Sequence, residues 1–93
     1  MNQKITAKRH LINFLKWTWL KGGKKFYTHD IQDLSLRSKM KFGRRLGSPD
    51  TYNRAFRQLK QNDLITCQEI NEPGKRESAW LMLNHNLDKE IKQ

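Results

Sequence analysis

Side chains able to pair with nucleic-acid bases and phosphates recur along one short segment, residues 48–65. An arginine guanidinium can form two parallel hydrogen bonds to guanine, and an asparagine amide can do the same with adenine. Threonine hydroxyls and helix N-termini bind phosphate oxygens. One side of the segment carries the polar residues Asp50, Thr51, Asn53, Arg54, Arg57, Gln58, Lys60 and Gln61. The chemistry open to this set is recognition through hydrogen bonds and charge.

The same segment has the signals of a helix that would hold these groups on one face. Ser48 is a suitable N-cap residue, because its hydroxyl can accept a backbone N–H of the first turn. Tyr52, Phe56 and Leu59 recur at spacings of four and three, which predicts an apolar stripe on the opposite side. Residues 62–63 can adopt left-handed conformations and are expected to end the helix.

Asp50 is the one acidic side chain on the polar side, and three roles are open to it. It could accept from a cytosine amine, fix Arg54 one helical turn along, or complete the N-terminal cap. We expect the cap, since the carboxylate lies at the positive end of the helix dipole.

Charge is distributed unevenly along the 93 residues. The formal net charge is +10, from 19 Lys and Arg against 9 Asp and Glu. Residues 1–60 hold fifteen basic and three acidic side chains, whereas residues 61–93 hold four basic and six acidic ones. A cationic field attracts phosphate polymers. The alternative explanation of this basic excess is that it serves solubility alone. We favour nucleic-acid binding, because the charge and the helix pattern both indicate it.

Features of enzymes, metal sites and membrane proteins are not evident. Cys67 is the only cysteine, is expected to be buried, and has no histidine near it in sequence. His10, His29 and His85 lack a metal-ligand spacing. There is no apolar run of membrane-spanning length and no secretory signal. We expect no enzyme activity, cofactor, metal or membrane partner, and a cytoplasmic, nucleoid-associated location.

Two helices are predicted before the polar segment. Thr6 can cap the first, from about Ala7 to Lys21, and Thr28 can cap the second, which begins at His29. A very short strand at residues 26–27 could separate them. The apolar face of the first helix comprises Leu11, Ile12, Phe14, Leu15, Thr18 and Trp19.

Trp17 and Leu20 fall outside this apolar face. They could pack beneath the C-terminal tail, or they could form a patch for a homodimer or a protein partner. We favour packing, since small basic domains often use every aromatic residue in the core.

The link to the polar segment is strongly basic: residues 35–47 hold five basic side chains and no acidic one. A short extra helix is predicted around Lys39–Arg45. Arg44 and Arg45 precede the helix N-terminus at Ser48, where cationic side chains and backbone N–H groups could bind phosphate together.

After residue 64 the pattern changes from helical to alternating. Extended runs at residues 65–70 and 77–83 flank a turn-rich loop, which predicts a β-hairpin. Lys75 and Arg76 at its tip could reach a DNA backbone or minor groove. An ordinary solvated turn is the alternative.

Three helices followed by a two-stranded hairpin resemble the winged helix-turn-helix superfamily. The resemblance is carried by Ser48, Tyr52, Phe56, Leu59 and the pair Leu64-Ile65. It implies an α+β, mostly α, three-helix fold with a C-terminal two-stranded β-hairpin wing. We expect one domain over residues 1–93, with a core at about 7–83 and a polar tail at 84–93. Asp63 departs from the family's usual glycine, and the basic link is longer than its tight turn.

The resemblance implies that the third helix enters the major groove of double-stranded DNA while the wing touches the neighbouring backbone or minor groove. Arg54 would then pair with guanine and Asn53 with adenine, and Thr51 would hold a phosphate. The full predicted DNA-binding set is Arg44, Arg45, Ser48, Asp50, Thr51, Asn53, Arg54, Arg57, Lys60, Lys75 and Arg76.

The leading hypothesis is therefore a small sequence-specific DNA-binding protein, a transcriptional regulator of a size that suits a phage or mobile element. A winged-helix protein-interaction module, on RNA polymerase or in a replication or repair complex, is the alternative, motivated by three tryptophans in so short a chain. RNA binding is a third possibility, although no aromatic sheet motif for stacking single-stranded bases is present.

Overall fold

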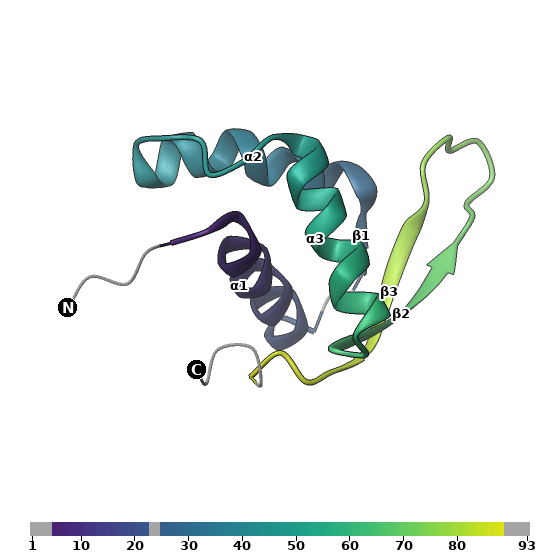
Figure 1. The fold of residues 1–93 in the computed structure, drawn as a ribbon. Coiled ribbons are helices and arrows are strands. Elements are labelled where there is room, and N and C mark those ends of the chain that lie inside the picture. Colours follow the sequence, from purple (N-terminus) through teal and green to yellow (C-terminus); the bar gives the residue numbers. More distant parts are fainter. Residues whose placement is uncertain (1–4, 23–24, 89–93) are drawn as a thin grey trace.

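The structure is a computed structural model, and it describes residues 5–22 and 25–88. Three helices pack together and against a three-stranded antiparallel sheet of order β1-β3-β2 (Figure 1). The elements are α1 (Ala7–Leu20), β1 (Lys25–Tyr27), α2 (Thr28–Phe42), α3 (Pro49–Gln61), β2 (Ile65–Ile70) and β3 (Ala79–His85). The predicted α+β class, mostly helical, is confirmed.

The first two helices begin in different ways. At α1 the prediction is confirmed, because the Thr6 hydroxyl accepts the N–H of Arg9 at 3.2 Å. At α2 the predicted cap is wrong: Thr28 is already helical, and the Asp30 carboxylate accepts the N–H of Tyr27 at 2.8 Å. This acid at the third helical position accepts the N–H of the N-cap residue, whereas an N-cap threonine would accept an N–H of the first turn.

The extra helix predicted around Lys39–Arg45 is wrong, because α2 continues unbroken through Phe42. It ends at Gly43, whose φ of 80° is left-handed and whose N–H donates to the Lys39 carbonyl at 3.0 Å. This is the usual glycine stop of a helix. The basic link to α3 is therefore short and lies wholly after Gly43.

Two buried serines hold that link against α2. The Ser38 hydroxyl accepts the N–H of Leu46 at 3.0 Å and donates to the Ser35 carbonyl at 2.7 Å. The Ser35 hydroxyl donates to the carbonyl of Gly47. Both serines are almost completely buried. Periodicity does not reveal this role, since a helical serine usually faces solvent or bonds within its own helix.

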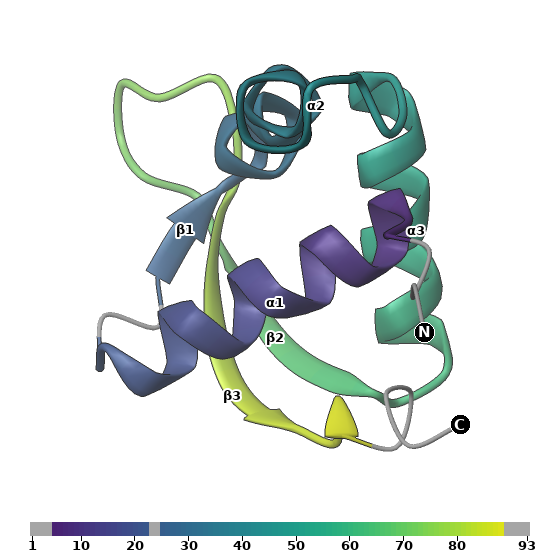
Figure 2. The same ribbon diagram turned by 90° about the vertical axis from the view of Figure 1, so that its left-hand side faces the viewer.

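The core lies where the three helices and the sheet meet. Figure 2 shows α1 crossing in front of β2 and β3, with α2 above it and α3 to one side. The predicted stripe of α3 is confirmed: Tyr52 and Leu59 are fully buried and Phe56 nearly so. Leu11 and Leu15 of α1 are also fully buried in this cluster.

Tyr52 is buried together with its hydroxyl, which is hydrogen-bonded to Nδ1 of His10 at 2.8 Å. Burial lowers the pKa of His10, and the nearby charges of Lys41 and Arg37 lower it further. The imidazole is therefore neutral at pH 7. His10 is isolated in sequence, but the fold makes it the polar partner that allows Tyr52 to be buried.

The predicted hairpin is confirmed and gains a third strand. β1 pairs with β3, placing Phe26 opposite Trp80. The polar tail predicted from residue 84 is wrong for its first part, because β3 runs to His85 and Leu87 is fully buried. The N–H of Asn86 donates to the Leu64 carbonyl at 2.7 Å, so the core extends beyond residue 83.

Trp17 and Leu20 do not pack beneath this tail as predicted. Trp17 is 57% exposed and Leu20 is 81% exposed. The tail instead packs against the neighbouring indole, with the Trp19 and His85 ring centroids 5.3 Å apart. None of the helices in residues 5–22 and 25–88 combines the length and apolar character needed to cross a membrane.

Ser38→Ala should lower the free energy of unfolding by about 1–3 kcal/mol, because it leaves the N–H of Leu46 without its buried acceptor. Urea denaturation at pH 7, followed by circular dichroism, measures the difference. Lys39→Ala, an exposed neighbour on α2, is the control. Equal stability of the two variants would mean that the link does not depend on this hydrogen bond.

Candidate nucleic-acid interface

α3 has the beginning and end that the sequence predicts. The Ser48 hydroxyl accepts the N–H of Thr51 at 3.2 Å, and Pro49 is the first helical residue. After the C-cap Asn62, Asp63 adopts a left-handed φ of 58°. Asp63 therefore makes the turn for which the resembled family usually has glycine.

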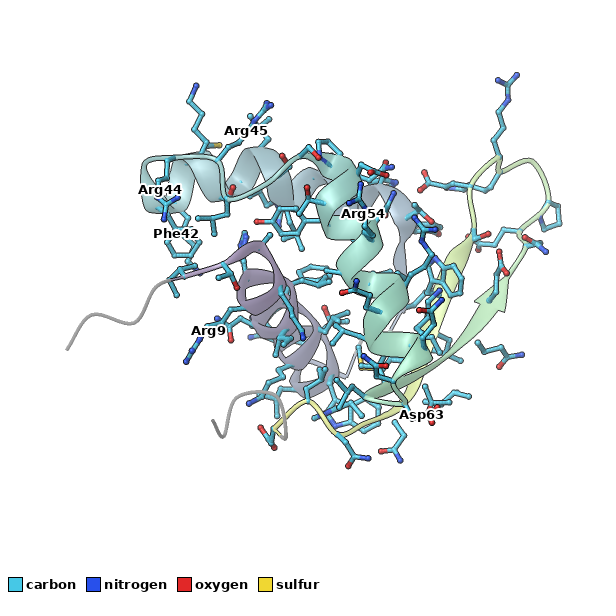
Figure 3. All side chains as sticks on the ribbon, viewed as in Figure 1. Arg9, Phe42, Arg44, Arg45, Arg54 and Asp63 are labelled. Carbon is cyan, nitrogen blue, oxygen red and sulfur yellow. The ribbon has the colours of Figure 1, made fainter. Side chains whose placement is uncertain are left out.

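The outer face of α3 is open to solvent. The side chains of Asp50 and Arg54 are 65% and 66% exposed, and Arg57 is exposed as well. Asn53 is half-buried. Figure 3 shows Arg54 on this helix, between α2 and the hairpin. The helix is thus two-sided, with its aromatic stripe inward and its guanidinium groups outward.

Asp50 does not form the cap that we predicted, because Ser48 does. Its carboxylate instead forms an ion pair with Arg54, one turn along, at 2.6 Å. This was one of the three roles left open. An exposed pair of this kind contributes at most about 1 kcal/mol, so it orients the guanidinium without holding it irreversibly.

Thr51 is occupied by local contacts. Its hydroxyl is hydrogen-bonded to that of Ser48 at 3.0 Å. A Cβ on Gly47 would come within 2.8 Å of the Thr51 methyl, so only glycine fits against it. The predicted phosphate contact by Thr51 would therefore have to share a hydroxyl that already supports the cap.

Lys60 is held between α3 and the sheet. Its ammonium lies 3.7 Å from the Trp80 ring centroid and 4.4 Å from that of Phe56. Burial lowers the pKa of Lys60. Cation–π contacts of a partly desolvated ammonium are stabilising, and here they join α3 to β3. Lys60 is thus oriented toward the protein's own rings.

Two glutamates attach the loop between β2 and β3 to the rest of the fold. Glu72 accepts from the Lys25 ammonium at 2.8 Å and from the Tyr27 hydroxyl at 2.7 Å. Glu77 accepts the backbone N–H of His29 at 2.8 Å and contacts its ring Nδ1 at 2.7 Å. These contacts lower the pKa of both glutamates and raise that of His29.

We call residues 71–78 the hairpin loop. Its two cations, Lys75 and Arg76, are both exposed at the tip. The Lys75 ammonium lies 5.0 Å from the Tyr27 ring centroid. Because the glutamates of the loop are paired with β1 and α2, the loop has a defined position while its cations face solvent.

The predicted DNA-binding residues do not form one continuous patch. Figure 3 places Arg44 and Arg45 at the end of α2 farthest from the hairpin, with Arg54 between them and the hairpin. Both arginines are exposed. The structure therefore places the predicted residues of α3 in the centre, with the other predicted cations toward the two ends of the molecule.

The arginine pair has basic neighbours that we did not predict as site residues. Arg37, Lys39 and Lys41 are exposed on the last turns of α2. The basic composition of residues 35–47 is the sequence signal that could have identified them. They were missed because a separate short helix was expected there, which obscured their positions on the faces of α2.

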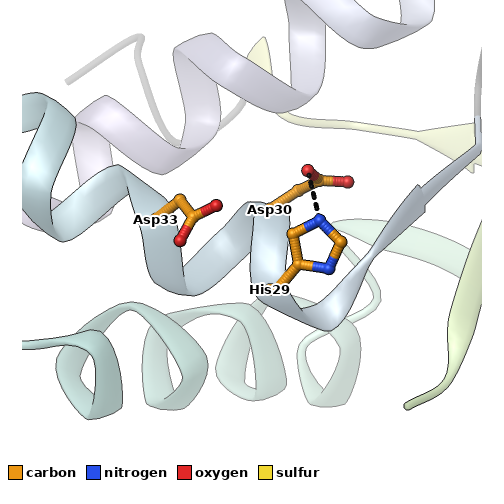
Figure 4. Close-up of side chains that lie close together, drawn as sticks. All are labelled: His29, Asp30 and Asp33. Atoms are coloured by element: carbon orange, nitrogen blue, oxygen red, sulfur yellow. Dashed lines mark ion pairs between the residues drawn. The ribbon is translucent and has the colours of Figure 1, made fainter. Parts of the chain in front are cut away.

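A second cluster combines His29 with two acids of α2. The possible ligand atoms of His29, Asp30 and Asp33 lie within 4.8 Å of one another, as Figure 4 shows. However, Nε2 of His29 is 3.3 Å from Asp30, and its Nδ1 contacts Glu77. Nδ1 thus attaches the hairpin loop, and Nε2 pairs with an acid of the same helix, so both ring nitrogens have partners within the protein.

Comparisons with protein-family models, with curated proteins and with solved structures found no match. The functional assignment therefore depends on the physical properties of the chain itself.

Glu77→Gln should lower the pKa of His29, because the glutamate hydrogen bond is the main cause of its increase above 6.5. A histidine whose folded pKa is raised stabilises the fold fully below about pH 6.5, and this stabilisation is lost as the pH rises through the folded value. Proton NMR titration of the imidazole measures the pKa. We also expect the amide exchange rate of the hairpin loop to increase with pH more in the wild type than in Glu77→Gln, because only the wild type has this stabilisation to lose.

Asp63→Asn removes a carboxylate after α3 at a left-handed position that asparagine tolerates, and serves as the control. It should leave the pKa of His29 unchanged. An unchanged pKa in Glu77→Gln would show that the loop is not attached through His29 in solution.

Proposed function

We propose that this protein binds double-stranded DNA as a small winged helix-turn-helix regulator. α3 would lie in the major groove, and the hairpin loop would contact the neighbouring backbone or minor groove. The support is the order of the elements, in which a third helix with an exposed polar face leads directly into a hairpin with a cationic tip. An α-helix fits the width of the major groove of B-DNA.

The observation that carries the proposal is the two-sidedness of α3. Its aromatic and aliphatic residues are almost completely buried, whereas Arg54 and Arg57 are exposed. Within the described residues Arg57 forms no ion pair, and Arg54 pairs only with an exposed carboxylate. Two guanidinium groups are thus available on the face that a groove would receive.

The Asp50–Arg54 pair is compatible with base recognition on energetic grounds. The exposed pair contributes at most about 1 kcal/mol, whereas a bidentate arginine–guanine contact supplies about 1–3 kcal/mol of discrimination. The guanine contact can therefore replace or share the aspartate contact. Asp50 would limit the directions in which the free guanidinium points and so reduce the entropy lost on binding.

A protein-interaction role is the second candidate, and the exposure of Trp17 favours it. Exposed large apolar side chains mark interaction sites when they gather in patches. This role does not compete with DNA binding, because Trp17 is on α1 and the candidate DNA-binding residues are on other elements. Selection from random duplex and single-stranded RNA libraries would separate DNA binding from RNA binding.

The affinity for a selected duplex should fall steeply with salt. If about six phosphates are neutralised, log K should change with log salt with a slope of roughly −5. Fluorescence anisotropy at several potassium chloride concentrations measures the slope. An affinity independent of salt, or no enrichment of any duplex, would contradict the proposal.

Arg54→Ala should cost about 1–3 kcal/mol for the selected site and relax specificity at one base position. Lys75→Ala should weaken all duplexes about equally and make the salt slope shallower by about one. Lys21→Ala, which removes the same charge at the end of α1, is the control. Equal losses in all three variants would indicate that only net charge matters.

A further inference from the structure

A groove of about 590 Å³ lies between α1 and α2. Its described lining residues all come from these two helices. Phe14 and Trp17 provide apolar surface on α1, and Leu34 and Met40 provide it on α2. Figure 2 shows the ribbons of α1 and α2, with α3 to one side. The groove is therefore separate from the outer face of α3.

Two of the groove's apolar side chains are unusually open to solvent. Trp17 is 57% exposed and Met40 is 81% exposed. A flexible methionine beside an indole adapts to varied apolar partners. Of the two residues predicted as a partner patch, only Trp17 lines the groove, and Leu20 lies outside it.

The charge of the groove identifies the kind of occupant. Arg37 and Lys41 line it one helical turn apart, and its described lining contains no acidic residue. Their positive potential also reaches the buried ring of His10. Burial is the main cause of the lowered pKa of His10, and these two cations lower it further. A second copy of this chain, with its own net charge of +10, would place like charges together at the groove.

We propose that the α1–α2 groove binds an acidic amphipathic helix of another protein. Its apolar face would cover Trp17 and Met40, and its carboxylates would pair with Arg37 and Lys41. The lining positions on α1 extend from His10 to Trp17, about 10 Å along the axis. This length suits two turns of a partner helix lying in the groove. The chain could then bind DNA and a protein at the same time.

The probe is a synthetic helical peptide of about 16 residues, with leucines at helical spacing and glutamates along one flank. A matched peptide has lysine at each glutamate position. The acidic peptide should shift the amide resonances of residues 10–17 and 34–41 and blue-shift tryptophan fluorescence. The lysine peptide should bind about tenfold more weakly or not at all.

Variants of α2 locate the site. Arg37→Glu with Lys41→Glu should weaken the acidic peptide by about tenfold or more, and Met40→Glu should do the same. Lys39→Glu and Leu36→Glu are the matched controls, since both residues are exposed on α2 but do not line the groove. They should leave the affinity unchanged. Circular dichroism establishes that each variant is folded.

Several results would overturn this inference. No resonance shift at millimolar acidic peptide, equal binding of the lysine peptide, or equal effects of lining and control variants would each do so. A dimer in sedimentation that Met40→Glu abolishes would identify a second copy as the occupant instead. Groove resonances that shift with duplex DNA would assign Arg37 and Lys41 to DNA. Arg54→Ala should leave peptide binding intact, so this inference and the DNA proposal can fail separately.

Discussion

The rest of the structure depends on burying the apolar stripe of α3. Tyr52 is fully enclosed, and its hydroxyl would be costly there without a partner. His10 of α1 supplies that partner in a neutral ring, while Ser38 of α2 holds the link that leads into α3. Both preceding helices are therefore tied to α3 by buried polar contacts as well as by packing. One consequence is that the outward face of α3 has a single orientation.

The acidic residues of the C-terminal third have a structural use. This part of the chain has more acids than bases, but Glu72 and Glu77 are paired with Lys25, Tyr27 and His29. They attach the hairpin loop and leave its own cations outward. Within this one loop the acids thus fix its position, whereas the cations Lys75 and Arg76 could meet a phosphate. Lys60 has a similar positioning use against Trp80.

The molecule presents two chemically different surfaces. The outer face of α3 is polar and cationic, whereas the groove between α1 and α2 is apolar with a cationic edge. A chain of this size has a limited core, so not every large apolar side chain can be buried. Trp17 and Met40 are left outside the core on facing helices, and their gathering in one groove distinguishes them from singly exposed residues.

The sequence by itself determined the bounds of α3, its serine cap, its buried stripe, its stop at Asp63 and the presence of the hairpin. These features depend on local backbone preferences and on helical or alternating spacing, which are written in neighbouring residues. Only the tertiary structure decided that Ser38 and Leu87 are buried, that Lys60 lies on Trp80 and that Trp17 stays exposed. Each of these depends on which distant segment packs alongside, and local spacing does not contain that information.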